Sequence, residues 1–318
     1  MYRKGKHREH MLLREFLMGF DIDCDCVSLD NIMSLDMFDG EFTGQCSPIF
    51  RWVGGKTQLL PALKFYSPQK FETYYEPFIG CGALLFSLMP ERAVINDINK
   101  TIINLYKDVR DNYLELLHVL KAMEKLPETE AVYLTVRDIY NDYVRTENYS
   151  VERSALFMYL NAKAFNSLYR VNSKGEFNVG YRKEVKAPSI YNAETLRFAH
   201  EYLSDNQVDI LSGDFLKATE KASKGDFVYF DPPYAPVSEA KNFTSYSQER
   251  FDVEDQKRLA EEFERLTRLG VKCLLSNSDC DLIRDLYKGY TIKTLNVNYY
   301  IQPTSDDIKR QEVLILNF

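Results

Sequence analysis

The chain has 318 residues, of which 45% are hydrophobic and 27% charged, and its formal net charge is −7. This length suffices for one large globular domain or two, and the composition excludes a disordered chain. No stretch reaches the roughly 18 uncharged apolar residues of a membrane span, and charged residues interrupt any signal-peptide core after the basic N-terminus. These features predict a cytoplasmic protein.

Charge is unevenly distributed along the chain. Residues 1–46 hold five basic and nine acidic residues without a sustained hydrophobic period, which predicts a flexible extension or a short surface helix. The segment from Arg145 to Lys186 holds eight basic and four acidic residues. A basic patch beside aromatic residues suits a nucleic-acid contact, although a solvated charged face has the same composition.

The six cysteines are scattered over the whole sequence. Cys24 and Cys26 are too close for the usual zinc-binding pair, and no histidine cluster accompanies them. We therefore expect free thiols in a reducing compartment and no metal site.

The apolar pattern predicts strands that alternate with helices, which indicates an α/β fold. Strands are expected at residues 93–96, 208–211, 226–230, 271–275, 290–295 and 313–316, with a further strand before Gly80. Helices are expected at residues 99–109, 111–124, 130–144, 151–164, 193–203, 253–269 and 281–287.

The stretch Asp231-Pro232-Pro233-Tyr234 directly follows the predicted strand 226–230. The two prolines cannot continue a strand ladder or start a helix without strain, so the backbone stays extended and its carbonyl groups remain free. Ligands of open α/β sheets bind beyond the carboxyl ends of the strands. The stretch therefore predicts a rigid shelf that offers a carboxylate, carbonyl acceptors and an aromatic ring, although a stiff surface turn has the same sequence.

Such a shelf suits the alkylation of an amino group on a planar ring. The lone pair of that nitrogen is delocalised until acceptors hold its N–H groups. Asp231 and the carbonyl of Asp231 or Pro232 can act as these acceptors, while Tyr234 stacks on the ring.

Gly80-Cys81-Gly82 forms a predicted turn between a strand and a helix, and it lacks the third glycine of a dinucleotide-binding motif. Asp97 ends the next strand, where it can accept hydrogen bonds from the ribose of an adenosine-containing ligand or cap the following helix. Gly55-Lys56-Thr57 is no phosphate loop, because Phe50 occupies the position of the required glycine. The paired glycines still predict a loop that approaches a ligand.

The run from Phe165 to Asn178 is polar, aromatic and punctuated by glycine, which predicts a hairpin or loop that contacts a partner. Arg170 can make a bidentate contact to a guanine edge, and Phe165 can wedge into a base stack. A surface arginine and a core phenylalanine are the alternative interpretations.

Together these motifs resemble those of the Dam-type, alpha-class DNA adenine-N6 methyltransferases. The resemblance extends from about Pro48 to the C-terminus. It is carried by the residues Phe50-Arg51-Trp52-Val53-Gly54-Gly55-Lys56, Glu76-Pro77-Phe78-Ile79-Gly80-Cys81-Gly82, Asn96-Asp97-Ile98-Asn99, Asp231-Pro232-Pro233-Tyr234-Ala235-Pro236 with Asn242-Phe243-Thr244, Phe165-Asn166-Ser167-Leu168-Tyr169-Arg170 and Gly175-Glu176-Phe177-Asn178-Val179.

This resemblance implies an α/β fold of the class I S-adenosylmethionine-dependent methyltransferase (Rossmann-like) type. A mainly helical target-recognition domain that carries a hairpin is inserted into the sheet domain. The expected domains are an extension at 1–46, a catalytic domain at 47–110 and 191–318, and a target-recognition domain at 111–190. The resemblance also implies a flipped-out adenine in double-stranded DNA, with GATC as the site. We expect a monomer that works alone or beside a cognate restriction endonuclease.

The resemblance assigns roles to individual residues. The catalytic set would be Asp231, Pro232, Pro233 and Tyr234. The cofactor S-adenosyl-L-methionine would contact Trp52, Lys56, Phe78, Gly80, Gly82, Asp97, Ile98, Asp214, Phe215 and Asp231. DNA would contact Arg51, Phe165, Asn166, Leu168, Arg170 and Asn172.

The sequence departs from the family pattern at Arg51, at Gly180 and at 297–302, where the family has lysine, proline and an arginine-containing run. None of these departures removes a catalytic residue. Two alternatives remain open: an amino-methyltransferase that acts on cytosine N4, RNA adenine or a protein glutamine, and a DNA-binding relative that has lost catalysis.

Overall fold

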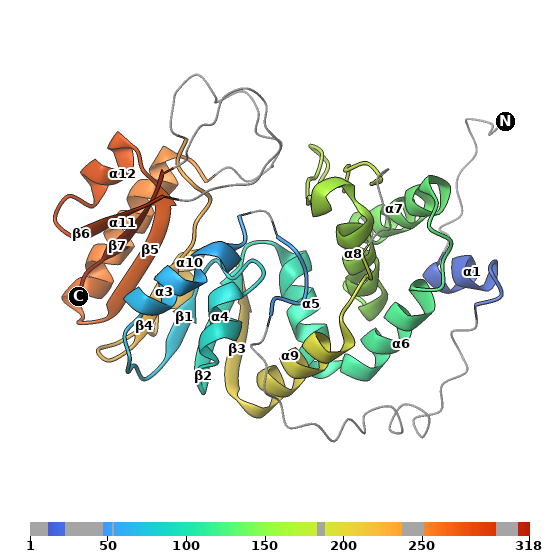
Figure 1. Ribbon diagram of the computed structural model, residues 1–318, viewed down its shortest axis with the longest axis horizontal. Helices are drawn as coiled ribbons and strands as arrows, with labels where there is room; N and C mark the ends of the chain where they lie inside the picture. Colours follow the sequence, from blue (N-terminus) through green and yellow to red (C-terminus); the bar gives the residue numbers. More distant parts are fainter. Residues whose placement is uncertain (1–11, 23–46, 53, 183–187, 237–250, 297–310) are drawn as a thin grey trace. The chain divides into compact units, whose positions relative to one another are not determined.

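The computed structural model describes residues 12–22, 47–52, 54–182, 188–236, 251–296 and 311–318 (Figure 1). The chain divides into two compact units. The helical unit comprises Met1–Gln45, Ile49–Val53 and Asn104–His200, and the sheet unit comprises Cys46–Pro48, Gly54–Ile103 and Glu201–Phe318. The units divide inside two helices, α5 (Lys100–Asp111) and α9 (Ala193–Asp205), whereas the sequence-based boundaries lie at 110/111 and 190/191.

The sheet unit is built on a seven-stranded sheet with the strand order β3-β2-β1-β4-β5-β7-β6. All pairs are parallel except those of β7 with β5 and β6. The strands are β1 (Tyr74–Glu76), β2 (Arg92–Asp97), β3 (Gln207–Ser212), β4 (Phe227–Phe230), β5 (Lys272–Ser278), β6 (Thr291–Asn296) and β7 (Gln311–Leu316). The sequence order reverses where β1 lies beside β4, and this reversal is where an open α/β sheet binds its ligand.

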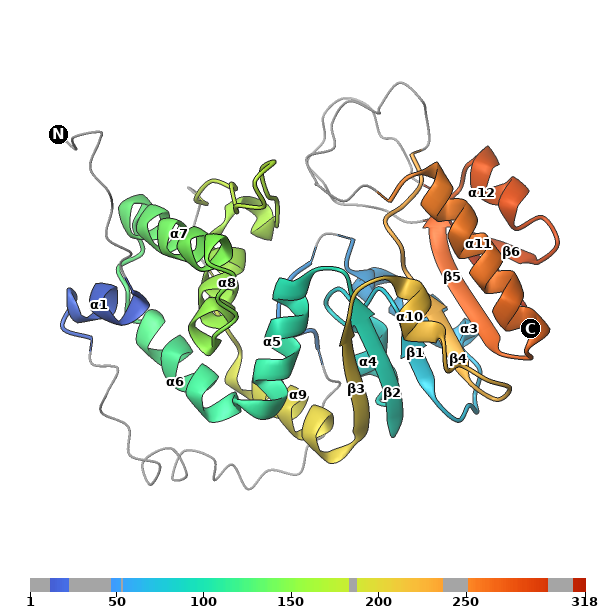
Figure 2. The same cartoon turned by 180° about the vertical axis from the view of Figure 1, so that it is seen from behind.

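Helices cover both faces of this sheet, so the central strands are apolar on both sides. Figure 1 shows α3 (Leu60–Tyr66) and α4 (Ala83–Leu88) on one face, and Figure 2 shows α10 (Phe215–Thr219) and α11 (Val253–Arg268) on the other. A 3-10 helix, η1 (Lys56–Leu59), precedes α3, and α12 (Asp281–Leu286) follows β5. Every residue of β4 is buried.

Helix α11 shows how the sequence specifies one of these covering helices. Asp252 forms a capping box with Asp255 at its N-terminus, and Gly270, with φ +79°, lies just beyond its end. Its apolar residues Leu259, Phe263 and Leu266 recur at helical spacing and join the core formed with β4 and β5.

The helical unit contains α6 (Tyr113–Met123), α7 (Glu130–Arg145) and α8 (Val151–Lys163), and α8 packs against both other helices. Almost all of α8 is buried. A short helix, α1 (Leu13–Met18), places Leu13 and Leu17 in the core, and a 3-10 helix, η2 (Phe165–Ser167), follows α8. No helix in the described ranges is long and apolar enough to cross a membrane.

Candidate active site

The predicted functional residues of the sheet unit meet at the carboxyl ends of four parallel strands. Asp231 follows β4, Asp97 ends β2, Asp214 lies just beyond β3, and the glycine turn at Gly80 follows β1. Because β1 pairs with both β2 and β4, these ends lie at one edge of the sheet, at the reversal of strand order.

The carboxylate of Asp231 is held on one side only. Its Oδ1 receives a hydrogen bond from Ser276 Oγ at 2.8 Å and an ion pair from Lys56 Nζ at 2.9 Å. Its Oδ2 accepts no hydrogen bond from any residue that the structure describes. The side chain is 19% exposed, so the second oxygen is available to a ligand in a largely desolvated place.

Lys56 is buried and holds three parts of the site together. Its Nζ donates to the carbonyl of Gly54 at 2.7 Å, pairs with Asp231, and lies 4.5 Å from the ring centre of Tyr234. Burial raises the pKa of Asp231, and the nearby Lys56 cation and the Ser276 hydrogen bond oppose that rise. Lys56 therefore favours the ionised form of the carboxylate.

The two prolines leave one carbonyl group free. The Pro233 carbonyl accepts a hydrogen bond from Gln256 Nε2 at 2.9 Å, whereas the Pro232 carbonyl has no donor among the residues placed by the structure. Tyr234 donates its hydroxyl to Glu312 Oε2 at 2.7 Å. The shelf thus offers two free acceptors, Asp231 Oδ2 and Pro232 O, beside an anchored aromatic ring.

Asp97 joins the glycine turn to the start of α5. Its Oδ2 accepts from the Gly80 N–H at 3.0 Å, and its Oδ1 accepts from the Asn99 N–H at 2.9 Å. Asn99 in turn accepts from the Thr101 N–H, so Asn99 caps the helix more directly than Asp97 does. Burial raises the pKa of Asp97 to about 6, although three backbone N–H groups oppose the rise.

Left-handed backbone brings the glycine turn close to this carboxylate. Gly80 and Gly82 have φ values of +47° and +67°, which a side chain would disfavour. Cys81 between them is a free thiol, and burial raises its pKa to about 12, so it stays protonated at neutral pH. No group of three metal-binding side chains occurs in the part of the chain that the structure describes.

Apolar surfaces flank the carboxylates at the strand ends. Ile98, next to Asp97, is 53% exposed, which is unusual for an isoleucine beside a sheet. Phe78 stacks on the buried Phe215 with ring centres 5.4 Å apart. These surfaces suit a flat ring such as adenine.

Asp214 caps α10 and forms an ion pair. Its Oδ1 accepts from the Leu216 N–H at 3.0 Å, and its Oδ2 pairs with Arg258 at 2.8 Å. Burial raises the pKa of Asp214, but the hydrogen bonds from Arg258 and Leu216 outweigh this and keep it below the usual value. Arg258 also lies over the Phe215 ring at 5.2 Å.

The remaining predicted site residues lie in the helical unit. Trp52 packs against Tyr169 with ring centres 5.1 Å apart. The main chain of Arg51 exchanges two hydrogen bonds with the Asn161 side chain, at 3.2 and 2.8 Å, which leaves the arginine side chain exposed. The fixed N-terminal segment thus presents Arg51 outward.

The predicted hairpin follows α8, with bridges at Ala164–Tyr181 and Val171–Phe177. Buried Asn141 of α7 holds it, because its amide accepts from the Phe177 N–H and donates to the Phe177 carbonyl. The predicted DNA contacts differ in availability: Phe165 is 51% exposed, Leu168 is half-buried, and the exposed Asn166 is left-handed with φ +52°.

Arg170 and Asn172 differ in how many of their side-chain hydrogen-bonding groups are engaged within this hairpin. Arg170 is exposed, and Asn178 accepts from its Nε at 2.8 Å and its Nη2 at 3.3 Å, so Nη1 remains for a base edge. The Asn172 amide bonds to Lys174 and Glu176 inside the turn. Asn172 therefore shapes the hairpin, and its contact with DNA stays a prediction.

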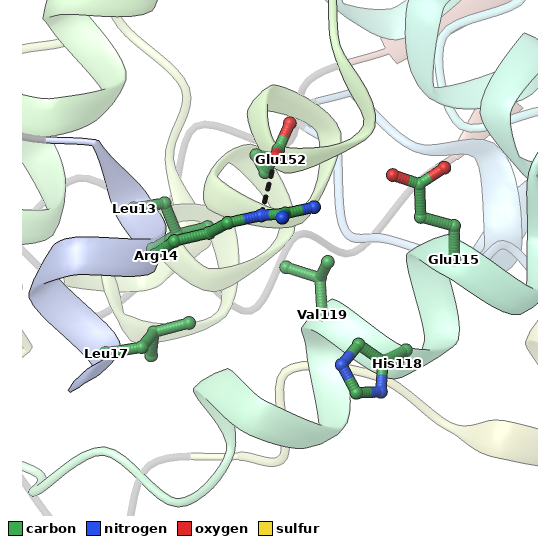
Figure 3. A pocket seen from close by; sticks show the side chains of 7 residues that line it. All are labelled: Leu13, Arg14, Leu17, Glu115, His118, Val119 and Glu152. Carbon is green, nitrogen blue, oxygen red and sulfur yellow. Dashed lines mark ion pairs between the residues drawn. The ribbon is translucent and has the colours of Figure 1, made fainter. Parts of the chain in front are cut away.

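A small pocket of about 30 Å³ lies beneath α1 in the helical unit (Figure 3). Arg14 points toward Glu152, 3.8 Å away, with His118 and Val119 on the adjoining helix. A volume of this size suits a water molecule and not a nucleoside. Helix α1 contributes the buried side chains Leu13 and Leu17 to the packing of this unit.

Several residues of the site escaped the sequence-based interpretation: Ser276, Asn277, Gln256, Arg258 and Glu312. The first two belong to a run of polar residues that ends the buried strand β5, and this polarity was the available signal. The predicted loop residues Asn242-Phe243-Thr244, the run 297–302 and most of the extension lie outside the described residues.

Comparison with known proteins gives consistent results. The family described as "D12 class N6 adenine-specific DNA methyltransferase" matches residues 52–301. The chain is 45% identical to "Type II methyltransferase M1.LlaDCHI" of Lactococcus lactis subsp. cremoris, over 77% of this chain and 86% of that protein. It is 36% identical to "Type II methyltransferase M.MjaIII" of Methanocaldococcus jannaschii, over 86% and 100%. It is 32% identical to the "DNA adenine methylase" of Escherichia coli, over 83% and 92%.

Proposed function

Because the chain belongs to the D12 class N6 adenine-specific DNA methyltransferases, and so is an adenine-specific DNA methyltransferase, we propose how it acts. It transfers the methyl group of S-adenosylmethionine to N6 of an adenine that is flipped out of a GATC site. The observation that carries the proposal is the pair of free acceptors, Asp231 Oδ2 and Pro232 O, at the reversal of the sheet.

These acceptors explain how the amine becomes reactive. An adenine N6 has two N–H groups, and the carboxylate and carbonyl each accept one of them. With both N–H groups held, the lone pair leaves conjugation with the ring, and the acceptors stabilise positive charge as it develops on nitrogen. The sulfonium cofactor supplies an already activated methyl group, so the protein mainly aligns the reacting atoms.

Lys56 keeps the carboxylate ready for this task. A protonated Asp231 has lost the negative charge that stabilises the amine, and burial favours protonation. The ammonium group 2.9 Å away offsets that effect and leaves Oδ2 free.

The carboxyl ends of β1, β2 and β3 fit an adenosine-containing cofactor. The half-buried Asp97 suits ribose hydroxyls, exposed Ile98 suits an adenine face, and Asp214 with Phe215 suits the adenine edge. Phe78, Gly80, Gly82, Lys56 and Trp52 complete the proposed cofactor set.

We assign DNA recognition to the helical unit, whose part Asn104–His200 includes the segment 111–190 that the sequence predicts as a target-recognition domain. The exposed Arg51, Phe165, Asn166 and Arg170 support this assignment, with Leu168 and Asn172 beside them. Relatives named "DNA adenine methylase" favour GATC as the site, and relatives named "Type II methyltransferase" favour a cognate restriction endonuclease. We propose a monomer that acts on DNA in the cytoplasm of a bacterial or phage-infected cell.

The site specificity is tested by protection of unmethylated plasmid. The protein is incubated with plasmid and S-adenosylmethionine, and the DNA is cut with nucleases that differ in sensitivity to adenine methylation at GATC. Protection is expected with the native protein and not with Asp231→Ala, which should still bind DNA. Methyl incorporation without protection at GATC would refute the proposed site and keep the reaction.

A further inference from the structure

A chain of buried side-chain amides holds the segment that contains the catalytic prolines. Gln256 of α11 and Asn277 of β5 are 1% and 0% exposed. Gln256 Nε2 donates to the Pro233 carbonyl at 2.9 Å, and Asn277 Nδ2 donates to Gln256 Oε1 at 3.1 Å. The two amides therefore act as one connected unit.

The same unit holds the chain on the far side of Tyr234. Asn277 Oδ1 accepts from the Ala235 N–H at 3.0 Å, and Ser278 Oγ donates to the Ala235 carbonyl at 2.8 Å. Hydrogen bonds thus fix residues 233 and 235, which flank the tyrosine whose hydroxyl is bound to Glu312.

The sequence makes such side-chain support necessary. Pro232 and Pro233 have no N–H groups, so this segment has no backbone donors of its own at these two positions. A buried amide that loses its partner destabilises the fold, so the connected bonds form together. The direction of the Pro232 carbonyl then depends on the anchored residues that follow it.

We propose that Gln256 and Asn277 are positioning residues for methyl transfer, a role that rests on the proposed function. They contact neither DNA nor cofactor in this scheme, and they act through the orientation of the Pro232 carbonyl and the Tyr234 ring. Losing them slows the transfer step and leaves the binding of both ligands intact.

The test compares variants in which an apolar side chain of similar size replaces a buried side-chain amide. The variants differ in which segment of the backbone that amide binds. Gln256→Met removes the donor to the Pro233 carbonyl, and Asn277→Leu removes the bonds to Gln256 and to the Ala235 N–H. Asn317→Leu is the matched control, because Asn317 holds the opposite end of β5 in the same manner. Its Oδ1 accepts from the Cys273 N–H at 2.7 Å, and its Nδ2 donates to the Val271 carbonyl at 2.9 Å.

Single-turnover methyl transfer is measured with saturating DNA and S-adenosylmethionine, beside thermal unfolding and the dissociation constants for S-adenosylhomocysteine and duplex DNA. We expect Gln256→Met to lower the rate constant about 10- to 100-fold while both dissociation constants stay within about threefold. Asn317→Leu should lower the unfolding temperature and leave the rate constant of the folded protein unchanged.

Two results would overturn the inference: a native rate constant in Gln256→Met, or an equal loss of rate in Asn277→Leu and Asn317→Leu. Absence of methyl transfer by the native protein would instead refute the proposed function, and this inference with it.

Discussion

Replacing Lys56 by methionine removes the cation that faces Asp231 and keeps an unbranched side chain that is one atom shorter. The lysine is 6% exposed and the aspartate 19%, and their charged atoms are 2.9 Å apart. The variant leaves Oδ1 with the Ser276 hydroxyl alone. It therefore tests whether Lys56 keeps the catalytic carboxylate ionised.

Removing one partner of a buried ion pair costs about 3–5 kcal/mol. Because Asp231 is partly exposed and retains Ser276, we expect a stability loss at the lower end, about 3 kcal/mol, and a further rise in the pKa of Asp231 once the opposing Lys56 cation is gone. A carboxyl whose pKa is raised by folding stabilises the protein at low pH, and this contribution is lost as pH rises through the raised pKa. The stability difference between Lys56→Met and the native protein should therefore widen as pH increases.

The assays are urea unfolding and single-turnover transfer, each across a range of pH. We expect the acid limb of the rate profile to move to higher pH in Lys56→Met, because the cation that opposes protonation of Asp231 is gone. Lys257→Met is the control, because Lys257 pairs with Glu254 on the surface, and it should change stability by less than about 0.5 kcal/mol. An unshifted acid limb in Lys56→Met would refute the role assigned to Lys56.

Three further predictions concern binding. The pKa of Asp97, raised to about 6, predicts that affinity for S-adenosylhomocysteine falls as pH drops below 6, because ribose hydroxyls donate to the ionised carboxylate. Calorimetry should find this dependence lost in Asp97→Asn, and a persistent dependence would assign it to another group. Arg258→Met should weaken cofactor binding about tenfold, because Asp214 loses its ion-pair partner. The control is Arg268→Met, which removes a surface ion pair with Glu264 and should leave cofactor binding unchanged. Equal effects of the two substitutions would contradict the prediction. Arg170→Ala should cost about 1–3 kcal/mol of discrimination at one base pair, measured as relative transfer rates on altered duplexes, and uniform weakening would make Arg170 a phosphate contact.

Local patterns were sufficient to predict most of the fold. The buried run Phe227–Phe230 and the strand that ends at Asp97 were predicted to within a residue or two. Helix α11 was predicted from its apolar spacing. In each case the hydrophobic period and the flanking turn residues agree, so one short window contains the necessary information.

The partners within the site could not be predicted in this way. Lys56 and Asp231 belong to distant parts of the chain, and a single sequence does not show that the fold joins them. Asn277 lies beyond the predicted strand 271–275, and its hydrogen bond to Gln256 depends on α11 lying beside β5. Asn172 was predicted to contact DNA from its place in a polar, aromatic run. In the structure its side-chain amide forms hydrogen bonds with Glu176 inside the turn. The boundaries between the two compact units lie inside α5 and α9. They follow from contacts between residues that are distant in the sequence, which local composition does not show.

The most direct test of the central claim is to supply S-adenosylmethionine with a deuterated methyl group and duplex DNA, and then to digest the DNA to nucleosides for mass spectrometry. We predict the deuterated methyl group on N6 of deoxyadenosine with the native protein, and its loss in Asp231→Ala. Label on N4 of deoxycytidine, or no label in DNA, would contradict the proposed chemistry at Asp231 and Pro232.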